Sequence, residues 1–408
     1  MLHIKREIYF ILIVILTISF ISGPVIGEEA PPNIEWQRCI GGTWTDWGYH
    51  GKLLLSADGG YYISATTFSS DGDFFQTNSQ NVLIKVNDSG SIEWIKSING
   101  FPYDAILLEN GKVLLYGYTS NNIWISEYYV NGEISREKTI GDQYTDIGFD
   151  ISQTRDGGLI CIGLTNGGSW SEIWAMKLDN NWEILWKTSI TVDPGLIPSD
   201  VEVGVDELET GDFKIYAYHH HERNGYYYPN PLIAKLNSDG AILWKYEYGG
   251  TEYDDRLKPN SYISLSNGNS IYTTWTRSND GNVSFNHGDE DLWVVETDPD
   301  GNILWEKTYG GSDSDAGVAI FQKDDGGYLV AGYSTSLDGD LFEINYQSQI
   351  PDMEENGNFI WILSINSQGR IDSQRCYGGT DGAGLIKIRE TIDGNYLFCG
   401  SVGSDGND

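Results

Sequence analysis

The sequence predicts an all-β protein that is built from one repeated four-stranded unit. Three observations support this prediction: a short motif recurs along the chain, a turn that ends in glycine precedes it, and the composition favours turns and aromatic strands. The 408 residues include 49 Gly, 26 Tyr and 14 Trp but only 3 Met. Glycine allows tight corners, and Tyr and Trp fill the pleated surface of a sheet.

The recurring motif is Ile-x-Trp, which occurs in clear copies and in degenerate ones. The clear copies are Ile34-Glu35-Trp36, Ile92-Glu93-Trp94, Ile184-Leu185-Trp186, Ile242-Leu243-Trp244 and Ile303-Leu304-Trp305, and the degenerate copies are Ile134-Ser135-Arg136 and Ile371-Asp372-Ser373. Successive copies are on average about 56 residues apart, which lies near the upper end of the periods of propeller blades. These seven units predict seven blades.

The clearest unit shows the order of the strands within a blade. It reads as strands over Ala316–Lys323, Tyr328–Tyr333, Phe359–Ile365 and Arg370–Cys376, with Asp325-Gly326-Gly327 as its first turn. A solenoid of helices would show an apolar period of 3.6 residues, and a sandwich would lack the similar units. We therefore expect a seven-bladed β-propeller of four-stranded antiparallel blades over residues 33–408.

The two ends of the chain predict how the ring closes. Ile34–Cys39 is expected to be the outer strand of the last blade, which receives its first two strands from Ala383–Glu390 and Tyr396–Ser401. The sequence stops at Asp408, before a further strand of this blade could form. We therefore expect the last blade to be incomplete, without its third strand, and the C-terminus to be truncated.

Residues 1–27 read as a signal peptide or as an N-terminal membrane anchor. Lys5 and Arg6 precede an apolar run from Ile8 to Ile21, and small residues follow before the first acidic ones. When the run is counted on to Ile26 it nearly reaches the length of a membrane span, so attachment through residues 8–26 stays open. Either alternative predicts a protein that is secreted or held at the cell surface.

The acidic composition limits the class of partner. Lys and Arg total 25 against 59 Asp and Glu, and the formal net charge of -34 would repel a phosphate backbone. Nucleic acid is therefore excluded as a partner, whereas solubility, salt adaptation and the attraction of cations stay open as explanations of the charge. The four cysteines do not cluster, so we expect free thiols without a metal.

The repeat resembles two groups of known propellers. Gly240 to Trp244 and Gly301 to Trp305 place a glycine four residues before a tryptophan, which is similar to the repeats of quinoprotein-type propellers, where this Trp docks blades together. The adjacent cysteines of those enzymes do not occur here, so their quinone cofactor is not carried over. Residues 305–311 and 325–333 more closely resemble secreted and surface propeller-repeat proteins of archaea and bacteria. That resemblance covers residues 33–408 and implies fold and extracellular placement without an activity.

An aspartate recurs where each unit enters its first strand, in most units four residues after a glycine. These residues are Asp46, Asp104, Asp146, Asp200, Asp254 and Asp315. If they begin the innermost strands, their carboxylates would form a ring at one mouth of the central channel that could hold Ca²⁺. Alternatively, each accepts backbone N–H bonds and fixes the crossing between blades. No other cofactor is predicted.

Ligand contacts are expected on the face that carries the loops between second and third strands, because these loops vary most in length. The loop of the fourth blade supplies the candidate contacts His219, His221, Tyr226, Tyr227 and Tyr228. On a strand the two histidines would point the same way and could share a transition metal, but no third ligand is evident nearby in the sequence. Aromatic side chains of this kind stack on sugar rings or on peptide surfaces.

The leading functional hypothesis is an extracellular binding scaffold for carbohydrate or for a surface protein. The alternative is a secreted propeller hydrolase or lyase that acts on polysaccharide. No nucleophile elbow and no zinc-binding His pair with an intervening Glu occurs, so we predict no catalytic residues and no enzyme. Segments that begin at Ser69, Ser278 and Ser336 resemble parts of calcium loops but lack the distal acid, so we expect plain turns.

Overall fold

The structure is a computed structural model of the whole chain. It describes residues 11–16, 34–44, 46–47, 53–75, 77, 80–141, 143–168, 170–193, 203–223, 226–255, 257, 261–342, 358–377, 383–390 and 396–402. The chain divides into two compact units, each of which is described by itself. One comprises residues 1–151 and 388–399, and the other comprises residues 152–387 and 400–408.

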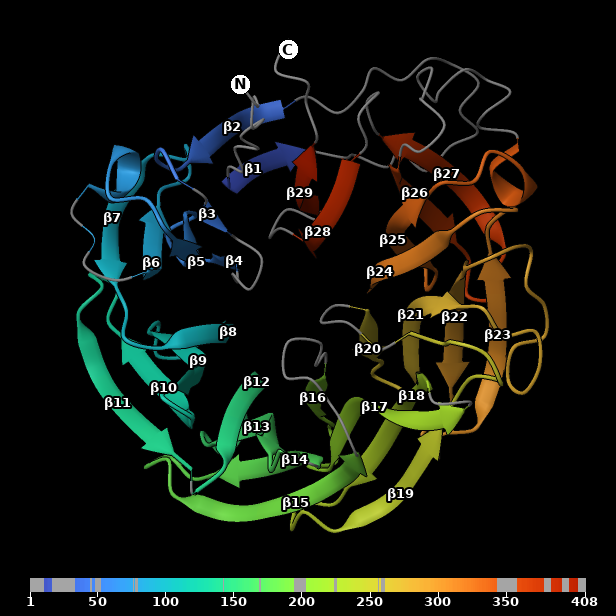
Figure 1. Cartoon of the computed structure of the whole chain (residues 1–408), viewed down its shortest axis with the longest axis horizontal. Helices are drawn as coiled ribbons and strands as arrows, with labels where there is room; N and C mark the ends of the chain where they lie inside the picture. Colours follow the sequence, from blue (N-terminus) through green and yellow to red (C-terminus); the bar gives the residue numbers. More distant parts are fainter. Residues whose placement is uncertain are drawn as a thin grey trace, which may run out of the picture. The chain divides into compact units, whose positions relative to one another are not determined.

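The described strands form antiparallel sheets, six with four strands and one with five. In most of the four-stranded sheets the strands follow one another in chain order, so that each strand pairs with the one before it and the one after it. Figure 1 shows such sets of four, for example β12 to β15. This meander is the strand order of a propeller blade, and it confirms the all-β propeller repeat that the sequence predicts.

Five sheets have this plain meander. The first contains β8 (Phe101–Leu107), β9 (Val113–Thr119), β10 (Asn122–Tyr128) and β11 (Ile134–Ile140). The next contains β12 (Thr145–Gln153), β13 (Leu159–Asn166), β14 (Ser171–Leu178) and β15 (Ile184–Asp193). Then follow β16 (Gly204–Glu207), β17 (Phe213–Arg223), β18 (Tyr226–Leu236) and β19 (Ile242–Glu247). The last two contain β20 (Tyr262–Ser264), β21 (Ser270–Thr276), β22 (Asp291–Thr297) and β23 (Ile303–Tyr309), and β24 (Asp315–Gln322), β25 (Tyr328–Ser334), β26 (Phe359–Ile365) and β27 (Ile371–Tyr377).

The five-stranded sheet differs at its inner edge. Its first strand consists of two short pieces, β3 (Asp46–Trp47) and β4 (Leu53–Leu55), which both pair with β5 (Tyr61–Thr67). The strands β6 (Asn81–Val86) and β7 (Ile92–Ser97) complete it. Two short 3-10 helices, η1 (Gly72–Phe74) and η3 (Gly339–Leu341), lie in loops that follow a second strand.

The remaining sheet differs from the expectation of a missing third strand. Its order is β2 (Ile34–Ile40), β1 (Ile11–Leu16), β29 (Tyr396–Val402) and β28 (Ala383–Glu390), so β1 pairs with both β2 and β29. β2 lies at one edge of this sheet, and the N-terminal apolar run lies between β2 and β29, where we expected no strand. An apolar run of Ile, Val and Leu has the composition of a buried strand, and its pairing removes two exposed strand edges.

The rest of the predicted signal or anchor segment lies outside the described residues, and the structure does not test that prediction. Among the residues that are described, none belongs to a helix with the length and hydropathy needed to cross a bilayer.

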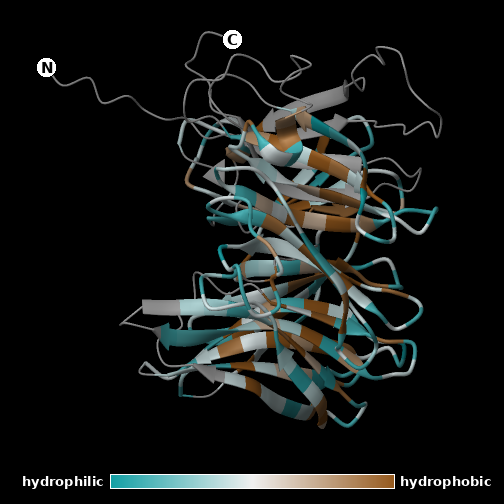
Figure 2. Cartoon of the chain, turned by 90° about the vertical axis from the view of Figure 1, so that its right-hand side faces the viewer, coloured by the Kyte–Doolittle hydropathy of each residue, from teal (hydrophilic) through white to brown (hydrophobic). Residues whose placement is uncertain are grey.

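The central strands of the sheets are apolar because both of their faces are covered. All seven residues of β5 and of β22 are buried, whereas β19, an outer strand, is mostly exposed. Figure 2 shows brown apolar residues along the strands and teal residues in many of the turns. Cys161 and Cys376 are free thiols.

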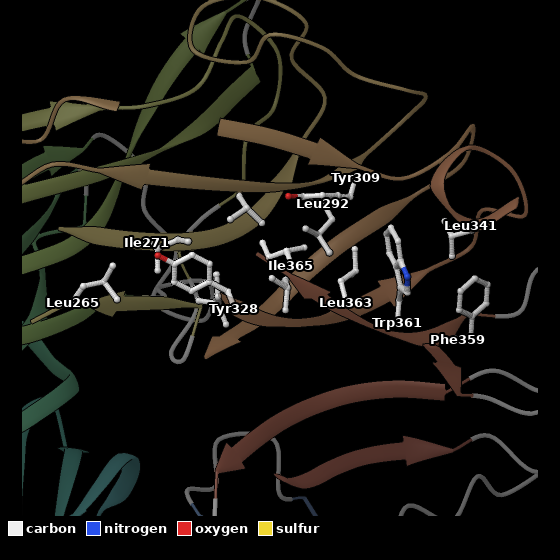
Figure 3. Packing of buried hydrophobic residues seen from close by; sticks show 13 residues of the cluster. Leu265, Ile271, Leu292, Tyr309, Tyr328, Leu341, Phe359, Trp361, Leu363 and Ile365 are labelled. Carbon is white, nitrogen blue, oxygen red and sulfur yellow. The ribbon is translucent and has the colours of Figure 1, made fainter. Parts of the chain in front are cut away.

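Neighbouring sheets share a core. Between the sheets of β20–β23 and β24–β27, side chains such as Ile271, Leu292, Tyr328 and Trp361 pack in one buried cluster (Figure 3). Large aromatic side chains contribute roughly 150 to 250 Å² of buried area each, so this packing is a main source of stability.

The tryptophan of the repeated motif packs against the glycine in the last turn of the following sheet. A Cβ atom added to that glycine would lie within about 3 Å of the indole ring. The pairs and distances are Gly132 and Trp94 at 3.1 Å, Gly240 and Trp186 at 2.5 Å, Gly301 and Trp244 at 3.0 Å, and Gly369 and Trp305 at 2.8 Å. All four glycines have positive φ, which glycine adopts without steric cost.

Candidate ligand-binding site

The candidate contacts of the fourth unit lie on a long hairpin formed by β17 and β18. Each of these strands has 11 residues, more than the usual strand of this protein. In their register His219 lies opposite Asn230, and His221 lies opposite Tyr228. Because opposite residues in an antiparallel pair share a face, these four side chains emerge on one side of the hairpin.

His219 and His221 point the same way and meet Glu247, which ends the neighbouring outer strand β19. The Nδ1 atom of His219 lies 3.0 Å from Oε1 of Glu247, and Nε2 of His221 lies 2.7 Å from Oε2. All three side chains are about one-third exposed. The carboxylate therefore bridges two imidazoles at the surface of the sheet.

This arrangement favours the charged form of Glu247. The hydrogen bond to His219 has the largest effect, burial opposes it, and His221 adds to it, so that the pKa of the Glu247 carboxyl falls to about 2. Glu247 is thus a carboxylate at any physiological pH. Within the described residues, His219, His221 and Glu247 are the group of three whose ligating atoms lie close together, all within 4.8 Å of one another.

His220 belongs to the other face of the same strand. Its ring lies 5.1 Å from that of Tyr218, measured between centroids. Alternation along β17 thus separates His220 from the two histidines on either side of it.

Tyr228 begins a row of aromatic side chains that leads from β18 to the next sheet. Its ring centroid lies 6.3 Å from that of Tyr253, and Tyr253 stacks on Trp275 at 4.9 Å with an angle of 7° between the rings. All three residues are partly exposed. Tyr226 and Tyr227 form part of β18, but their side chains are outside the described part of the structure.

Arg277 borders this aromatic row. Its guanidinium carbon lies 6.0 Å from the centroid of Trp275, within the range of a cation–π contact. The same guanidinium pairs with Glu290 at 2.6 Å and with Asp289 at 3.3 Å. The row therefore combines flat apolar faces with charged donors and acceptors at one edge.

The recurring aspartates are buried where they are described, and Asp254 and Asp315 bind groups of their own sheets. Asp254 accepts hydrogen bonds from the backbone N–H of Gly250 at 2.6 Å, from the Ser278 hydroxyl at 2.9 Å and from the Thr276 hydroxyl. Asp315 repeats this pattern with Gly311 and Ser336, each at 2.8 Å. These contacts join the segment that enters the sheet to the loop after its second strand.

Two further aspartates are also buried. Asp104 accepts hydrogen bonds from the N–H of Ala105 at 2.8 Å and of Ile151 at 3.0 Å, and Asp146 is buried at the start of β12. Asp46 lies in β3, but its side chain is not described, and Asp200 lies outside the described residues. The bonds of Asp254 and Asp315 correspond to the alternative in which the Asp fixes the entry into a sheet, and a cation ring stays a prediction.

The segments that begin at Ser69, Ser278 and Ser336 are more than the plain turns that we expected. In the second of them, the Ser278 hydroxyl accepts from the N–H of Glu252, and Asp280 accepts from both the N–H and the hydroxyl of Thr251. The other two hold the entering segment in the same way, through Asp71 and Asp338. The calcium-like spacing here reflects hydrogen bonds within the chain, which hold the entering segment to the loop.

Sequence reasoning missed Glu247, Tyr253 and Trp275. Glu247 is 26 residues from His221, and only the pairing of β17, β18 and β19 brings the two together. Tyr253 precedes the recurring Asp254, and Trp275 precedes its partner Thr276, so a search for aromatic residues beside that pairing could have found both.

No protein-family model matches this sequence, and no curated protein matches it. Several solved structures are similar to this chain at a low level. An α-L-arabinanase of Penicillium chrysogenum complexed with arabinobiose is 15% identical, with a TM-score of 0.41, over 73% of this chain and 92% of that one. An ulvan lyase bound to a sulfated disaccharide repeat is 12% identical, with a TM-score of 0.47, over 81% of each chain.

A quinonprotein alcohol dehydrogenase-like protein of Bacteroides thetaiotaomicron is also similar. It is 10% identical, with a TM-score of 0.45, over 84% of this chain and 68% of that one. At this level of similarity the comparisons do not assign an activity to this chain.

Proposed function

We propose that this protein is an extracellular binding scaffold that recognises carbohydrate through the aromatic row Tyr228, Tyr253 and Trp275. The observation that carries the proposal is the stack of Tyr253 on Trp275, partly exposed and bordered by Arg277. Flat aromatic faces bind the apolar C–H face of a sugar ring, and charged groups beside them bind its hydroxyls. A protein ligand is the alternative partner.

The rigid base of this surface supports the proposal. Tyr253 lies in the segment that enters the sheet, whose backbone is fixed by hydrogen bonds from Asp255 N–H to Trp275 O at 3.0 Å and from Arg277 N–H to Tyr253 O at 2.8 Å. The rings are therefore held in place before a ligand arrives. Preorganisation of this kind lowers the entropic cost of binding.

The same proposal includes the finer architecture and the location. The repeats would close into seven blades with β2 as the outer strand of the last one. Residues 1–27 would direct export or attach the protein to a membrane, and β1 would then leave its place between β2 and β29. The seven copies of the motif and the apolar N-terminal run support these two points.

A glycan-array screen of the full chain tests the binding proposal. Trp275→Ala and Tyr253→Ala are expected to lower glycan affinity at least 10-fold, because each removes a stacking face. Phe75→Ala is the matched control, since Phe75 is an aromatic residue in the loop between β5 and β6 that is 76% exposed. This variant should bind as the wild type does.

Three results would count against the proposal or redirect it. Equal binding by wild type and Trp275→Ala, with both variants folded by circular dichroism, would contradict the role of the aromatic row. Release of sugar products from a bound polysaccharide would favour the hydrolase or lyase alternative. Absence of glycan binding in every array would contradict the carbohydrate proposal and favour a protein ligand.

A further inference from the structure

We propose that His219, His221 and Glu247 form a site for a divalent transition metal of the zinc type. The site lies on the hairpin of β17 and β18 and on the neighbouring strand β19. It does not depend on the glycan proposal, because none of its three ligands belongs to the aromatic row.

The donor set is the first argument. Two neutral imidazole nitrogens and one carboxylate are ligands that Zn²⁺ binds at about 2.0 to 2.2 Å, in a tetrahedron with a fourth position for water. Ligating atoms of such a tetrahedron are roughly 3.3 Å apart. The two His-to-Glu separations are 3.0 Å and 2.7 Å, and all three ligating atoms lie within 4.8 Å of one another. Small side-chain rotations therefore suffice to admit an ion.

The backbone geometry is the second argument. His219 and His221 are two residues apart on one strand, so alternation directs both rings to the same face, where their centroids are 4.9 Å apart. Glu247 reaches them from β19 across β18. Because all three ligands are anchored in regular strands, the site is held more precisely than a loop would hold it.

Asn230 supplies an independent third observation. It lies opposite His219 in the register of β17 and β18, on the same face of the hairpin. Asn230 is 8% exposed as a residue, and its Oδ1 atom has no hydrogen-bond partner among the described residues. A buried polar oxygen without a partner destabilises the folded state. A metal-bound water beside His219 would donate to this oxygen and remove that destabilisation.

The competing explanation is a simple ion pair, in which Glu247 bridges two histidines and no metal binds. The visible absorption of added Co²⁺ distinguishes the two explanations. Cobalt takes the place of zinc in tetrahedral N and O sites, and its visible absorption reports that geometry, whereas an ion pair alone would give no such bands.

The experiment titrates the full chain, made without a histidine tag, with CoCl₂ and follows visible absorption, and then titrates it with ZnCl₂ by calorimetry. We expect one equivalent of tetrahedral Co²⁺ that Zn²⁺ displaces, and a rise of the unfolding temperature with added Zn²⁺. The double variant His219→Ala/His221→Ala should lose at least about 100-fold in affinity, and Glu247→Gln should lose about 10- to 100-fold. Asn230→Ala should weaken binding less than Glu247→Gln.

His220→Ala is the matched control, because His220 lies on the same strand but on its other face. It should keep the full cobalt spectrum. Circular dichroism checks that each variant folds, and Glu247→Gln, which preserves size, tests the site even if the double variant does not fold. Absence of cobalt bands in the wild type, or equal Zn²⁺ affinity in wild type and Glu247→Gln, would overturn the proposal.

Discussion

The indole ring of Trp305 lies against Gly369, the turn glycine of the following sheet. A Cβ atom built on Gly369 would lie 2.8 Å from Cζ3 of that ring, closer than packed carbon atoms approach. The hydroxyl of Tyr309 also donates a hydrogen bond to the carbonyl of Gly369 at 2.6 Å. The tryptophan of one repeat therefore packs against the last turn of the next sheet.

Replacement of Gly369 by alanine should therefore destabilise the protein more than a turn glycine usually does. The φ of Gly369 is +70°, which costs an alanine about 1 kcal/mol, and the contact with Trp305 adds to this cost. We expect the free energy of unfolding to fall by about 2 to 4 kcal/mol in urea denaturation.

Gly326 provides the matched control. Its φ is +82°, but an added Cβ would meet nothing within 4 Å. Gly326→Ala should therefore show the backbone cost of about 1 kcal/mol alone. Equal losses in the two variants would show that the contact between Gly369 and Trp305 does not stabilise the fold.

The same contact shows what could be predicted from the sequence. The spacing of glycine and tryptophan, as in Gly301 to Trp305, indicated a docking role for the tryptophan, and this is confirmed. The partner was not predictable, because Trp305 packs on Gly369 of the next repeat and not on the glycine four residues before it. The spacing of glycine and tryptophan in the sequence predicts a hairpin within one sheet. The residue against which the tryptophan packs depends on how neighbouring sheets meet.

Asp254 should stabilise the attachment of the entering segment to its sheet. Its buried carboxylate accepts hydrogen bonds from Gly250, Thr276 and Ser278. Asp254→Ala leaves these donors without a partner, which should lower the free energy of unfolding by about 2 to 4 kcal/mol in urea denaturation. Asp239→Ala, in an exposed turn, is the control and should change it by less than about 0.5 kcal/mol.

Asp315 should make stability depend on pH in the acidic range. Burial raises the pKa of its carboxyl to about 6, even though hydrogen bonds from Ser334, Gly311 and Ser336 oppose that rise. The unfolded chain releases this proton near pH 4. Between about pH 4 and pH 6 the folded state holds more protons than the unfolded state, so stability falls as pH rises through this interval.

Asp315→Asn removes this titration. The variant should lose less stability than the wild type between pH 4 and pH 6, by roughly 2 to 3 kcal/mol for a shift of two pH units. Thermal unfolding at several pH values measures the difference. Parallel pH profiles for wild type and variant would contradict the raised pKa.

The part of the candidate site that could be predicted is the part set by the alternation of side chains along one strand. The sequence placed His219 and His221 on one face, and the structure confirms this through their shared partner Glu247. Glu247 itself could not be found, because strand pairing and not sequence distance brings it near. Tyr228 was predicted as a contact, but its neighbours Tyr253 and Trp275 depend on how the next sheet is entered.

Lys177 is a buried lysine that donates hydrogen bonds to the turn at residues 154–158 of its own sheet. This lysine is 4% exposed, and its Nζ donates to the Thr154 hydroxyl and to Asp156, each at 2.9 Å, and to the carbonyl of Leu178 at 3.2 Å. Burial raises the pKa of Asp156, but hydrogen bonds from Thr154 and Lys177 outweigh burial and lower that pKa to about 2. The lysine thus holds the turn at 154–158 in place.

Lys177→Met should therefore weaken the fold and change its response to acid. A folded-state pKa below the unfolded value of about 4 contributes stability above pH 4, and this contribution is lost as pH falls from about 4 to 2. In Lys177→Met the free energy of unfolding should be about 1 to 3 kcal/mol lower at neutral pH, and less of it should disappear in acid. Lys245→Met, at an exposed lysine of β19, is the control and should keep the acid response of the wild type. An acid response in Lys177→Met equal to that of the wild type would show that the lysine does not set the pKa of Asp156.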